Sequence, residues 1–276
     1  MSAFSTHKIK RYFATFFLIG ILATLLIAGC STHGLMTVSD DRATAPIALT
    51  VSAAASLQDA LKAIAPKFSA AHPNITIDYN FGASGALQQQ IEQGAPADVF
   101  FPAATKQMDA LADRDLILSS SRQTLLTNSL VLIAPLTSPL NITNLSQLRT
   151  TDITRFAVGE FRSVPAGQYA EQAFKQLALL DSLQSKFVFG NTVRNVLAAV
   201  ESGNAELGMV YASDAQLSNQ VKVLATAPAG AHPPIVYPIA ALKSTPHPEA
   251  AQTFINFLTT EAAQSTFQAF GFGPGE

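Results

Sequence analysis

Short apolar segments alternate with amphipathic helical segments along the chain, and this alternation restricts its fold more than any other feature. Residues 47–51 form an apolar segment that predicts a buried strand, and apolar side chains then recur at helical spacing from 57 to 68. Strands are predicted again at 75–79 and 97–101, with a helix between them that begins after Ser84. This β-α-β-α-β order implies a mostly parallel sheet with right-handed crossovers. The predicted fold class is therefore α/β.

A second unit of the same kind follows the apolar run 130–134, which predicts a strand leading out of the first unit. Two such units, between which the chain crosses more than once, place a cleft at the carboxyl ends of the strands. The glycine-rich segment 271–275 is predicted to be a tail. Further strands are predicted at 156–159, 187–189, 207–211, 221–224 and 236–241, and helices at 166–180, 193–202 and from Pro248 onward.

The composition supports a folded protein and excludes two other classes. The 276 residues are enough for about two average domains. Apolar residues make up 48% of the chain and charged residues 13%, whereas disordered chains combine low hydrophobicity with high net charge. The formal net charge of −2 offers no basic surface for nucleic acid.

The first 29 residues have the pattern of a secretory signal. Lys8, Lys10 and Arg11 precede the uncharged stretch 12–28, which suits a signal peptide and is at the short edge for a membrane span. The alternative is an uncleaved N-terminal anchor. Both interpretations place the folded part outside the cytoplasm, in the periplasm or at the cell surface. Residues 1–29 hold three cations and no anion, so without them the net charge falls from −2 to −5.

Cys30 closes this segment and is the only cysteine of the sequence. The run Leu-Ile-Ala-Gly-Cys at 26–30 resembles a bacterial lipobox, in which a signal peptidase cuts before a cysteine that then carries lipid. We therefore expect 1–29 to be a lipoprotein signal peptide, Cys30 to be lipidated and 30–45 to form a flexible tether. A buried, inert cysteine is the alternative. A single cysteine also excludes an internal disulfide and a cysteine-based metal site.

Four strands lead through small residues into the start of a helix. These junctions lie at 53–56, 81–85, 164–167 and 190–193. A helix start carries unpartnered backbone N–H groups and the positive end of the helix dipole, and small residues let an anion approach both. Serine hydroxyls in the first two junctions add donors. Four such junctions that converge in a cleft would form an oxyanion site that needs neither a metal nor a lysine.

Each junction also has a purely structural interpretation. Ser56, with Asp59 three residues later, has the pattern of a capping box, in which both side chains serve the helix start. Ser84 lies next to glycine and fits a tight turn. Pro165 before a helix is ordinary at the first helical position. The junctions alone favour an anion site only modestly.

A secreted serine hydrolase is the competing class. The run Gly-Ala-Ser-Gly-Ala at 82–86 approaches the nucleophile elbow G-x-S-x-G, but Ala86 replaces the final glycine. No ordered set of histidine and acidic residues completes a catalytic triad. The five histidines never fall at the spacing of zinc ligands, so no metal site is predicted.

Several of these segments, taken together and in order, resemble the molybdate-binding proteins of molybdate ABC transporters. The likeness spans about residues 47 to 273. The segments that carry it are 53–57 (AAASL), 81–85 (FGASG), 94–100 (GAPADVF), 122–126 (RQTLL), 128–130 (NSL), 164–167 (VPAG), 207–211 (LGMVY) and 213–215 (SDA).

This resemblance implies a type II periplasmic-binding-protein fold, with two lobes joined by hinge strands around a ligand cleft. One lobe would consist of 46–128 plus 237–276 and the other of 129–236. The implied function is capture of molybdate or tungstate, as the transported ligand and not as a cofactor, for the membrane permease of an ABC importer. The protein would be a monomer without enzymatic activity that contacts the membrane only through its lipid. The alternatives are a binding protein for another tetrahedral oxyanion, such as sulfate or phosphate, and the effector lobe of a regulator, which the secretory segment disfavours.

The resemblance also implies which residues touch the ligand. These are the hydroxyls and amides of Ser56 and Ser84, the backbone amides at Ala166 and Val193, and the hydroxyl of Tyr211. The first two would lie in one lobe and the last three in the other, so a ligand that touches both stabilises the closed form. Without the resemblance, Tyr211 would be interpreted as a core aromatic residue.

Two neighbouring features modify this site. Ala83 stands where many relatives have serine, which could remove a hydroxyl from the pocket, and Pro102 replaces another frequent serine. Arg194 follows Val193 and could balance a dianion, but we expect it to pair with an acidic residue at the surface, outside the ligand contacts.

Overall fold

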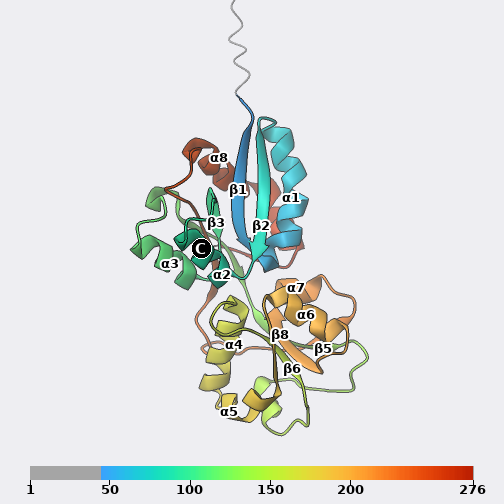
Figure 1. Ribbon diagram of the computed structural model, residues 1–276. Coiled ribbons are helices and arrows are strands. Elements are labelled where there is room, and N and C mark those ends of the chain that lie inside the picture. The colour runs from blue at the N-terminus through green and yellow to red at the C-terminus, as the bar shows by residue number, and fades with distance from the viewer. Residues whose placement is uncertain (1–44, 276) are drawn as a thin grey trace, which may run out of the picture. The chain divides into compact units, whose positions relative to one another are not determined.

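The computed structural model describes residues 45–275, which form one compact α/β unit (Figure 1). The predicted signal peptide, Cys30 and nearly all of the predicted tether lie outside the described residues. No helix among the described residues is both long and apolar enough to cross a bilayer.

The first of two sheets has six strands and forms the core of the first lobe. Strand β1 pairs in parallel with β2 and β3, whereas β10 pairs antiparallel with β3 and β4, and β11 antiparallel with β4. In spatial order the strands are β11 (Gly273–Pro274), β4 (Gln123–Asn128), β10 (Ile235–Ala241), β3 (Val99–Phe101), β1 (Ile47–Ala54) and β2 (Ile75–Gly82).

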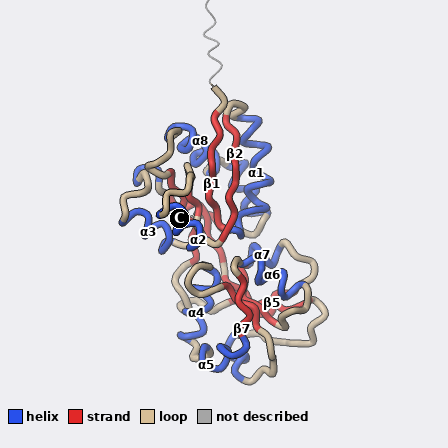
Figure 2. Tube along the Cα trace, viewed as in Figure 1, coloured by secondary structure: helices blue, strands red, loops and turns tan. Residues whose placement is uncertain are grey.

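The second sheet has five strands and forms the core of the second lobe (Figure 2). Strand β6 pairs in parallel with β7 and β8, and β5 pairs antiparallel with β8 and β9. In spatial order the strands are β7 (Phe187–Gly190), β6 (Phe156–Gly159), β8 (Leu207–Tyr211), β5 (Leu130–Pro135) and β9 (Val221–Thr226).

The two-lobed α/β fold is confirmed, but the expectation of mostly parallel sheets is wrong, because both sheets are mixed. The antiparallel pairs arise where the chain crosses between lobes. Strand β4 passes into β5 through Ser129 alone, and β9 returns to β10 through residues 227–234. The connecting strands β4 and β10 run side by side in opposite directions. The lobe boundaries at 128/129 and 236/237 stay a prediction, and the second falls inside β10.

Helices cover the sheets at most of the places where helical spacing predicts them. The predicted helix 166–180 is divided, because α4 ends at Gln176 and Ala178 has a left-handed φ of 52° that a helix cannot continue through. The C-terminal helical region is likewise two helices. The helices are α1 (Gln58–Ala71), α2 (Ser84–Glu92), α3 (Thr105–Asp113), α4 (Pro165–Gln176), α5 (Leu180–Leu183), α6 (Val193–Glu201), α7 (Ala212–Gln216), α8 (Pro248–Leu258) and α9 (Glu261–Ala269), with 3-10 turns η1 (Ala55–Leu57), η2 (Ser119–Ser121), η3 (Leu145–Arg149) and η4 (Gln184–Lys186).

The C-terminal residues fasten to the first lobe. The segment 271–275, expected to be a tail, instead contains β11, whose residues Gly273 and Pro274 pair with Thr127 and Leu126 of β4. Aromatic side chains support this attachment, since the ring centroid of Phe272 lies 5.4 Å from that of Tyr237 on β10. Glycine is required at position 275 for the close approach of this segment to β4, because a Cβ on Gly275 would lie 2.2 Å from the carbonyl oxygen of Thr124.

Candidate functional site

A small cavity lies where the strand-to-helix junctions of the two lobes meet. Its cavity volume is about 10 Å³, roughly the space that one water molecule needs, so the closed arrangement has no room for a drug-sized organic molecule. All of its lining side chains are uncharged. They belong to Ala54, Ala55, Ser56, Gly82, Ala83, Ser84, Ala103, Val164, Pro165, Ala166, Thr192, Val193 and Tyr211.

The five residues predicted to touch a ligand all line this one cavity. Ser56 and Ser84 come from the first lobe, and Ala166, Val193 and Tyr211 from the second. Each is at most 4% exposed. The structure therefore brings together residues that are far apart in sequence, while their contact with a ligand stays a prediction.

Three helices begin at the cavity, at Ser84, Pro165 and Val193. The first N–H groups of a helix have no partner within it, so those without another partner are available to an anion, and the helix dipole adds positive charge at the same point. At the start of α2 the N–H of Gly85 is already bonded to the carbonyl oxygen of Ser163. The start of α4 is held against the end of β6 by two glycines, since a Cβ on Gly167 would lie 2.0 Å from the carbonyl oxygen of Gly159. Glycine at that position is what allows this helix start to reach the strand end.

The Ser84 hydroxyl is fixed by a backbone donor. Its Oγ accepts a hydrogen bond of 3.0 Å from the N–H of Ala103. A backbone N–H can only donate, so the hydroxyl proton of Ser84 is free to point elsewhere. Ser84 is therefore more than a turn residue, because its oxygen holds the 102–104 loop and its proton remains available.

Ser56 does not form the capping box with Asp59 that was the alternative interpretation of this junction. It lies inside the turn η1, whose N-cap is Ala54, and no side chain caps that turn. Asp59 is drawn instead to Arg194 on the second lobe, and the Ser56 hydroxyl lies 3.1 Å from the hydroxyl of Tyr237. Both side chains of the apparent capping box therefore make contacts with residues that are distant in sequence.

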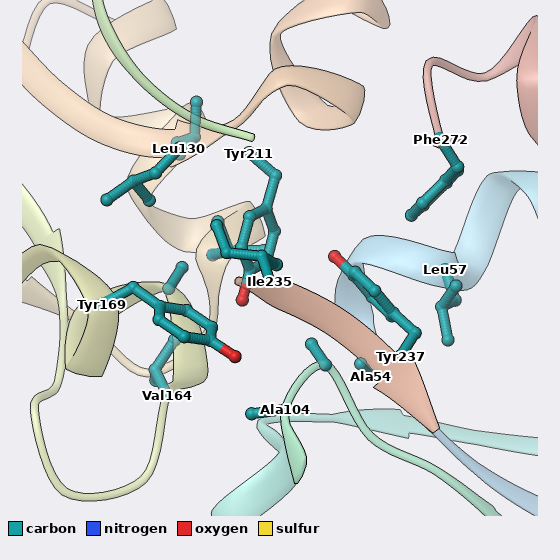
Figure 3. Close-up of a cluster of buried hydrophobic side chains, with 14 of the residues drawn as sticks. Ala54, Leu57, Ala104, Leu130, Val164, Tyr169, Tyr211, Ile235, Tyr237 and Phe272 are labelled. Atoms are coloured by element: carbon teal, nitrogen blue, oxygen red, sulfur yellow. The ribbon is translucent and has the colours of Figure 1, made fainter. Parts of the chain in front are cut away.

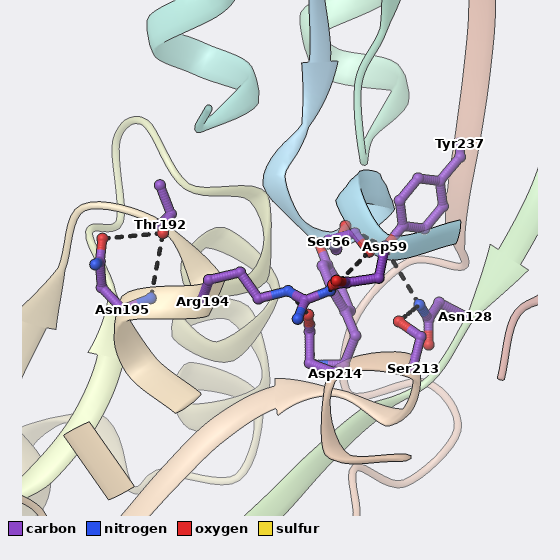
Figure 4. A network of polar contacts seen from close by, with 10 residues as sticks. Ser56, Asp59, Asn128, Thr192, Arg194, Asn195, Ser213, Asp214 and Tyr237 are labelled. Atoms are coloured by element: carbon purple, nitrogen blue, oxygen red, sulfur yellow. Dashed lines mark hydrogen bonds and ion pairs between the residues drawn. The ribbon is translucent and has the colours of Figure 1, made fainter. Parts of the chain in front are cut away.

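Arg194 joins carboxylates of both lobes (Figure 4). Its Nη2 lies 2.7 Å from Oδ2 of Asp59, and its Nε lies 2.8 Å from Oδ1 of Asp214. The second contact lacks hydrogen-bond geometry and is an electrostatic pair. Arg194 is outside the cavity lining and pairs with acidic residues, as expected. Asp59 is 40% exposed, but Asp214 is fully buried, so the second pair is not a surface pair.

Asp214 is fully buried beneath Arg194. Burial raises the pKa of Asp214 to about 6, against the lowering effects of the Arg194 charge and of the Tyr211 N–H that donates to its Oδ2 at 3.3 Å. The carboxyl therefore titrates close to neutral pH and supports the end of β8, where Tyr211 lies.

The Tyr211 hydroxyl is buried and has no hydrogen-bond partner among the described residues. Its ring packs against Tyr237, with ring centroids 5.9 Å apart (Figure 3). Burial raises the pKa of Tyr211 well above its ordinary value, so the hydroxyl keeps its proton and can donate it. An unpaired buried hydroxyl costs about 1–3 kcal/mol. Its place at the cavity therefore favours a bound acceptor.

The lobes also touch each other beside the cavity. The N–H of Gly85 donates to the carbonyl oxygen of Ser163 at 2.9 Å, and Gln107 Nε2 donates to Gln168 Oε1 at 3.1 Å. A Cβ on Gly85 would lie 2.8 Å from the Ser163 backbone, so glycine is required for this contact. The described arrangement is thus one in which the lobes are closed on each other.

Neither a catalytic nor a metal site is found at the cavity. No histidine or carboxylate lies among its lining residues, so Ser84 has no general base there. No group of three or more histidine, cysteine, aspartate or glutamate side chains that could hold a metal occurs within residues 45–275.

Several residues of this region were not predicted. Thr192 lines the cavity and caps α6, since its hydroxyl oxygen accepts from the Asn195 N–H at 3.2 Å. A threonine before an apolar helix is a recognisable cap signal. Tyr237 and Asp214 carry no local signal, because their roles depend on partners distant in sequence.

Comparisons with known proteins agree on one family. The profile of the family described as bacterial extracellular solute-binding protein matches residues 49–273. YvgL of Bacillus subtilis (strain 168), which carries the provisional name of an ABC transporter substrate-binding lipoprotein, is 40% identical over 95% of this chain and 98% of its own length. The molybdate-binding protein ModA of Escherichia coli (strain K12) is 40% identical over 81% of this chain and 88% of its own length. The solved periplasmic molybdate-binding protein of Azotobacter vinelandii has a TM-score of 0.75 at 26% identity and covers 83% of this chain and 100% of its own.

Proposed function

Because the chain belongs to the family of bacterial extracellular solute-binding proteins, we propose that it captures molybdate or tungstate and delivers it to the permease of an ABC importer. It is a binding component of a transporter and not an enzyme. The observation that carries the choice of ligand is the cavity between the lobes, which offers hydroxyls and helix starts and no charged side chain.

Five residues would hold the oxyanion. The hydroxyls of Ser56, Ser84 and Tyr211 donate to its oxygens, and the amides at the starts of α2, α4 and α6 complete the set, including those of Ala166 and Val193. Hydrogen bonds to a charged acceptor are about twice as strong as neutral ones, so several together compensate for the lost hydration of a dianion. The donors come from both lobes, and the ligand would therefore stabilise their closed arrangement.

The absence of a carboxylate from the cavity lining supports selection against phosphate. Molybdate near neutral pH is fully deprotonated, and its four oxygens only accept hydrogen bonds. Hydrogen phosphate carries a proton that needs an acceptor, and no carboxylate lines the cavity. Leaving that proton unpaired in a buried site costs about 1–3 kcal/mol. Sulfate carries no proton, and we propose that it is rejected because it is smaller and cannot keep every hydrogen bond short between rigid helix ends.

The experiment is a calorimetric titration of the purified protein with molybdate, tungstate, sulfate and phosphate. We expect tight binding of the first two, much weaker binding of sulfate and little of phosphate. Sulfate or phosphate binding as tight as molybdate would assign the protein to another tetrahedral oxyanion. Turnover of an ester substrate that depends on Ser84 would support the hydrolase alternative instead.

We also propose that the chain is a lipoprotein anchored through Cys30 outside the cytoplasm. The lipobox-like run at 26–30 supports this proposal, as does the likeness to YvgL, whose name describes a lipoprotein and which matches 95% of this chain. The lipid would hold the protein at the membrane that carries its permease. The protein would otherwise act as a monomer.

A further inference from the structure

A chain of two hydrogen bonds leads from Asn128, at the crossing between the lobes, through Tyr237 to Ser56, and a third bond branches from Asn128 to Ser213 (Figure 4). Nδ2 of Asn128, the last residue of β4, donates to Ser213 Oγ at 2.8 Å and to Tyr237 Oη at 3.2 Å. Tyr237 Oη in turn lies 3.1 Å from Ser56 Oγ. Tyr237 and Ser213 are fully buried, and Ser56 is 2% exposed.

The direction of this chain is set by its first member. The N–H of Ser129 donates to Asn128 Oδ1 at 2.8 Å, which fixes the oxygen on one side of the amide and the nitrogen on the other. An amide nitrogen carries two protons and accepts none. Both protons of Asn128 are thus committed, one to Ser213 and one to Tyr237.

Counting protons along the chain then fixes the role of Ser56. Tyr237 accepts from Asn128, and Ser56 Oγ is the one other partner of its hydroxyl among the described residues. Either hydroxyl could donate across this pair, but donation from Tyr237 to Ser56 is the arrangement that leaves no buried Tyr237 proton unpaired. Ser56 therefore accepts from Tyr237, and its own proton is left to point into the cavity that it lines. Ser84 reaches the same state by another route, because its Oγ accepts from the N–H of Ala103.

We propose that Asn128 and Tyr237 are positioning residues that hold the Ser56 hydroxyl as a donor toward the bound oxyanion. This inference rests on the proposed function. Neither residue lines the cavity, so both act through Ser56. We call the hydrogen bonds Asn128–Tyr237–Ser56 the relay. A serine hydroxyl can donate or accept, and the relay leaves the Ser56 hydroxyl only its proton to offer the ligand, which strengthens the preference for an anion without a proton. Its position at β4 and β10 also couples the donor to the strands that join the lobes.

A double-mutant cycle of Tyr237→Phe and Ser56→Ala tests the relay by calorimetric titration with molybdate. Tyr237→Phe keeps the ring that packs against Tyr211 and Phe272 and removes only the hydroxyl. We expect it to weaken molybdate binding about fivefold to tenfold in the wild-type background, the worth of one hydrogen bond, and less than twofold in the Ser56→Ala background. The ratio of molybdate to phosphate affinity should also fall in Tyr237→Phe, because Ser56 regains the freedom to accept.

Tyr79→Phe is the matched control. Its hydroxyl is also buried, has no partner among the described residues and lies outside the cavity, so molybdate affinity should not change. Asn128→Ala provides a second cycle with Ser56→Ala, with the same expected non-additivity, in case Tyr237→Phe does not fold.

An equal loss in both backgrounds, or no loss in the wild-type background, overturns the relay. Failure of the wild-type protein to bind any oxyanion overturns the proposed function instead. The two failures are therefore distinguishable in one set of titrations.

Discussion

The buried carboxyl of Asp214 should make the stability of the protein depend on pH in an unusual direction. A rise of its pKa from 3.8 to about 6 corresponds to about 3 kcal/mol between the folded and unfolded chains. Between these two pH values the folded chain holds a proton at Asp214 that the unfolded chain has lost. The stabilisation linked to this proton is fully present below pH 3.8 and is lost as the pH rises through about 6.

The substitution Asp214→Asn removes this titration while it keeps the size of the side chain. The free energy of unfolding of the variant, minus that of the wild type, should therefore increase by about 3 kcal/mol between pH 3.5 and pH 7. Denaturant titrations followed by circular dichroism, repeated at half-unit pH steps, measure this difference. Taking the difference cancels the carboxylates that both chains share.

Asp59→Asn is the matched control, because it removes the other carboxylate that faces Arg194 but from a side chain that is 40% exposed. This variant shows how the loss of one carboxylate partner of Arg194 affects stability when that carboxylate is not buried. A constant difference between Asp214→Asn and wild type at all pH values, or one that decreases as the pH rises, would refute the reasoning that burial dominates over the Arg194 charge.

Three further predictions concern the ligand and the anchor. Ser84→Ala should weaken molybdate binding in calorimetry by about 1–3 kcal/mol, because a donor to a charged oxygen is lost, and an unchanged affinity would remove Ser84 from the site. Gly85→Ala should also weaken it, because the new Cβ would lie 2.8 Å from the Ser163 backbone in the closed arrangement, and scattering with saturating molybdate should show a less compact particle than wild type. Cys30→Ala should leave the signal segment attached or release soluble protein, as mass spectrometry of membrane and soluble fractions would show; wild-type protein that is soluble with Met1 intact would contradict lipidation.

Much of the fold follows from local periodicity, since the apolar runs and helical spacings predicted most of the strands and helices. The antiparallel pairing of the strands could not be predicted this way. The strand β4 has too little apolar alternation to stand out, and the partner of each connecting strand is set by how the chain crosses between lobes. The prediction of a tail at 271–275 was wrong for a related reason. Glycines in this segment allow close packing against β4, and the sequence alone does not distinguish this role from chain flexibility.

The cavity could be predicted in outline because its parts repeat a local pattern, small residues before a helix start. Its supporting contacts could not. Ser56 and Tyr237 are 181 positions apart, and nothing near either residue indicates the other. The sequence around Asp59 fits a capping box, but in the structure its carboxylate forms an ion pair with Arg194, which is distant in sequence. Local patterns therefore locate the donors, while the groups that orient those donors depend on the tertiary fold.

The uncharged lining of the cavity has a kinetic consequence. Residues 30–276 carry a net charge of −5, and no cationic side chain at the cavity counters it locally. A dianion therefore approaches a protein of the same sign of charge, and the local attraction comes from the helix starts at the cavity and not from cationic side chains that line it. Added salt screens the repulsion between these like charges, so the association rate constant should rise with ionic strength, opposite to the usual behaviour of charged ligands and their receptors. A high affinity for the oxyanion would then come from slow dissociation. The ion would stay bound until the protein meets the permease of the transporter.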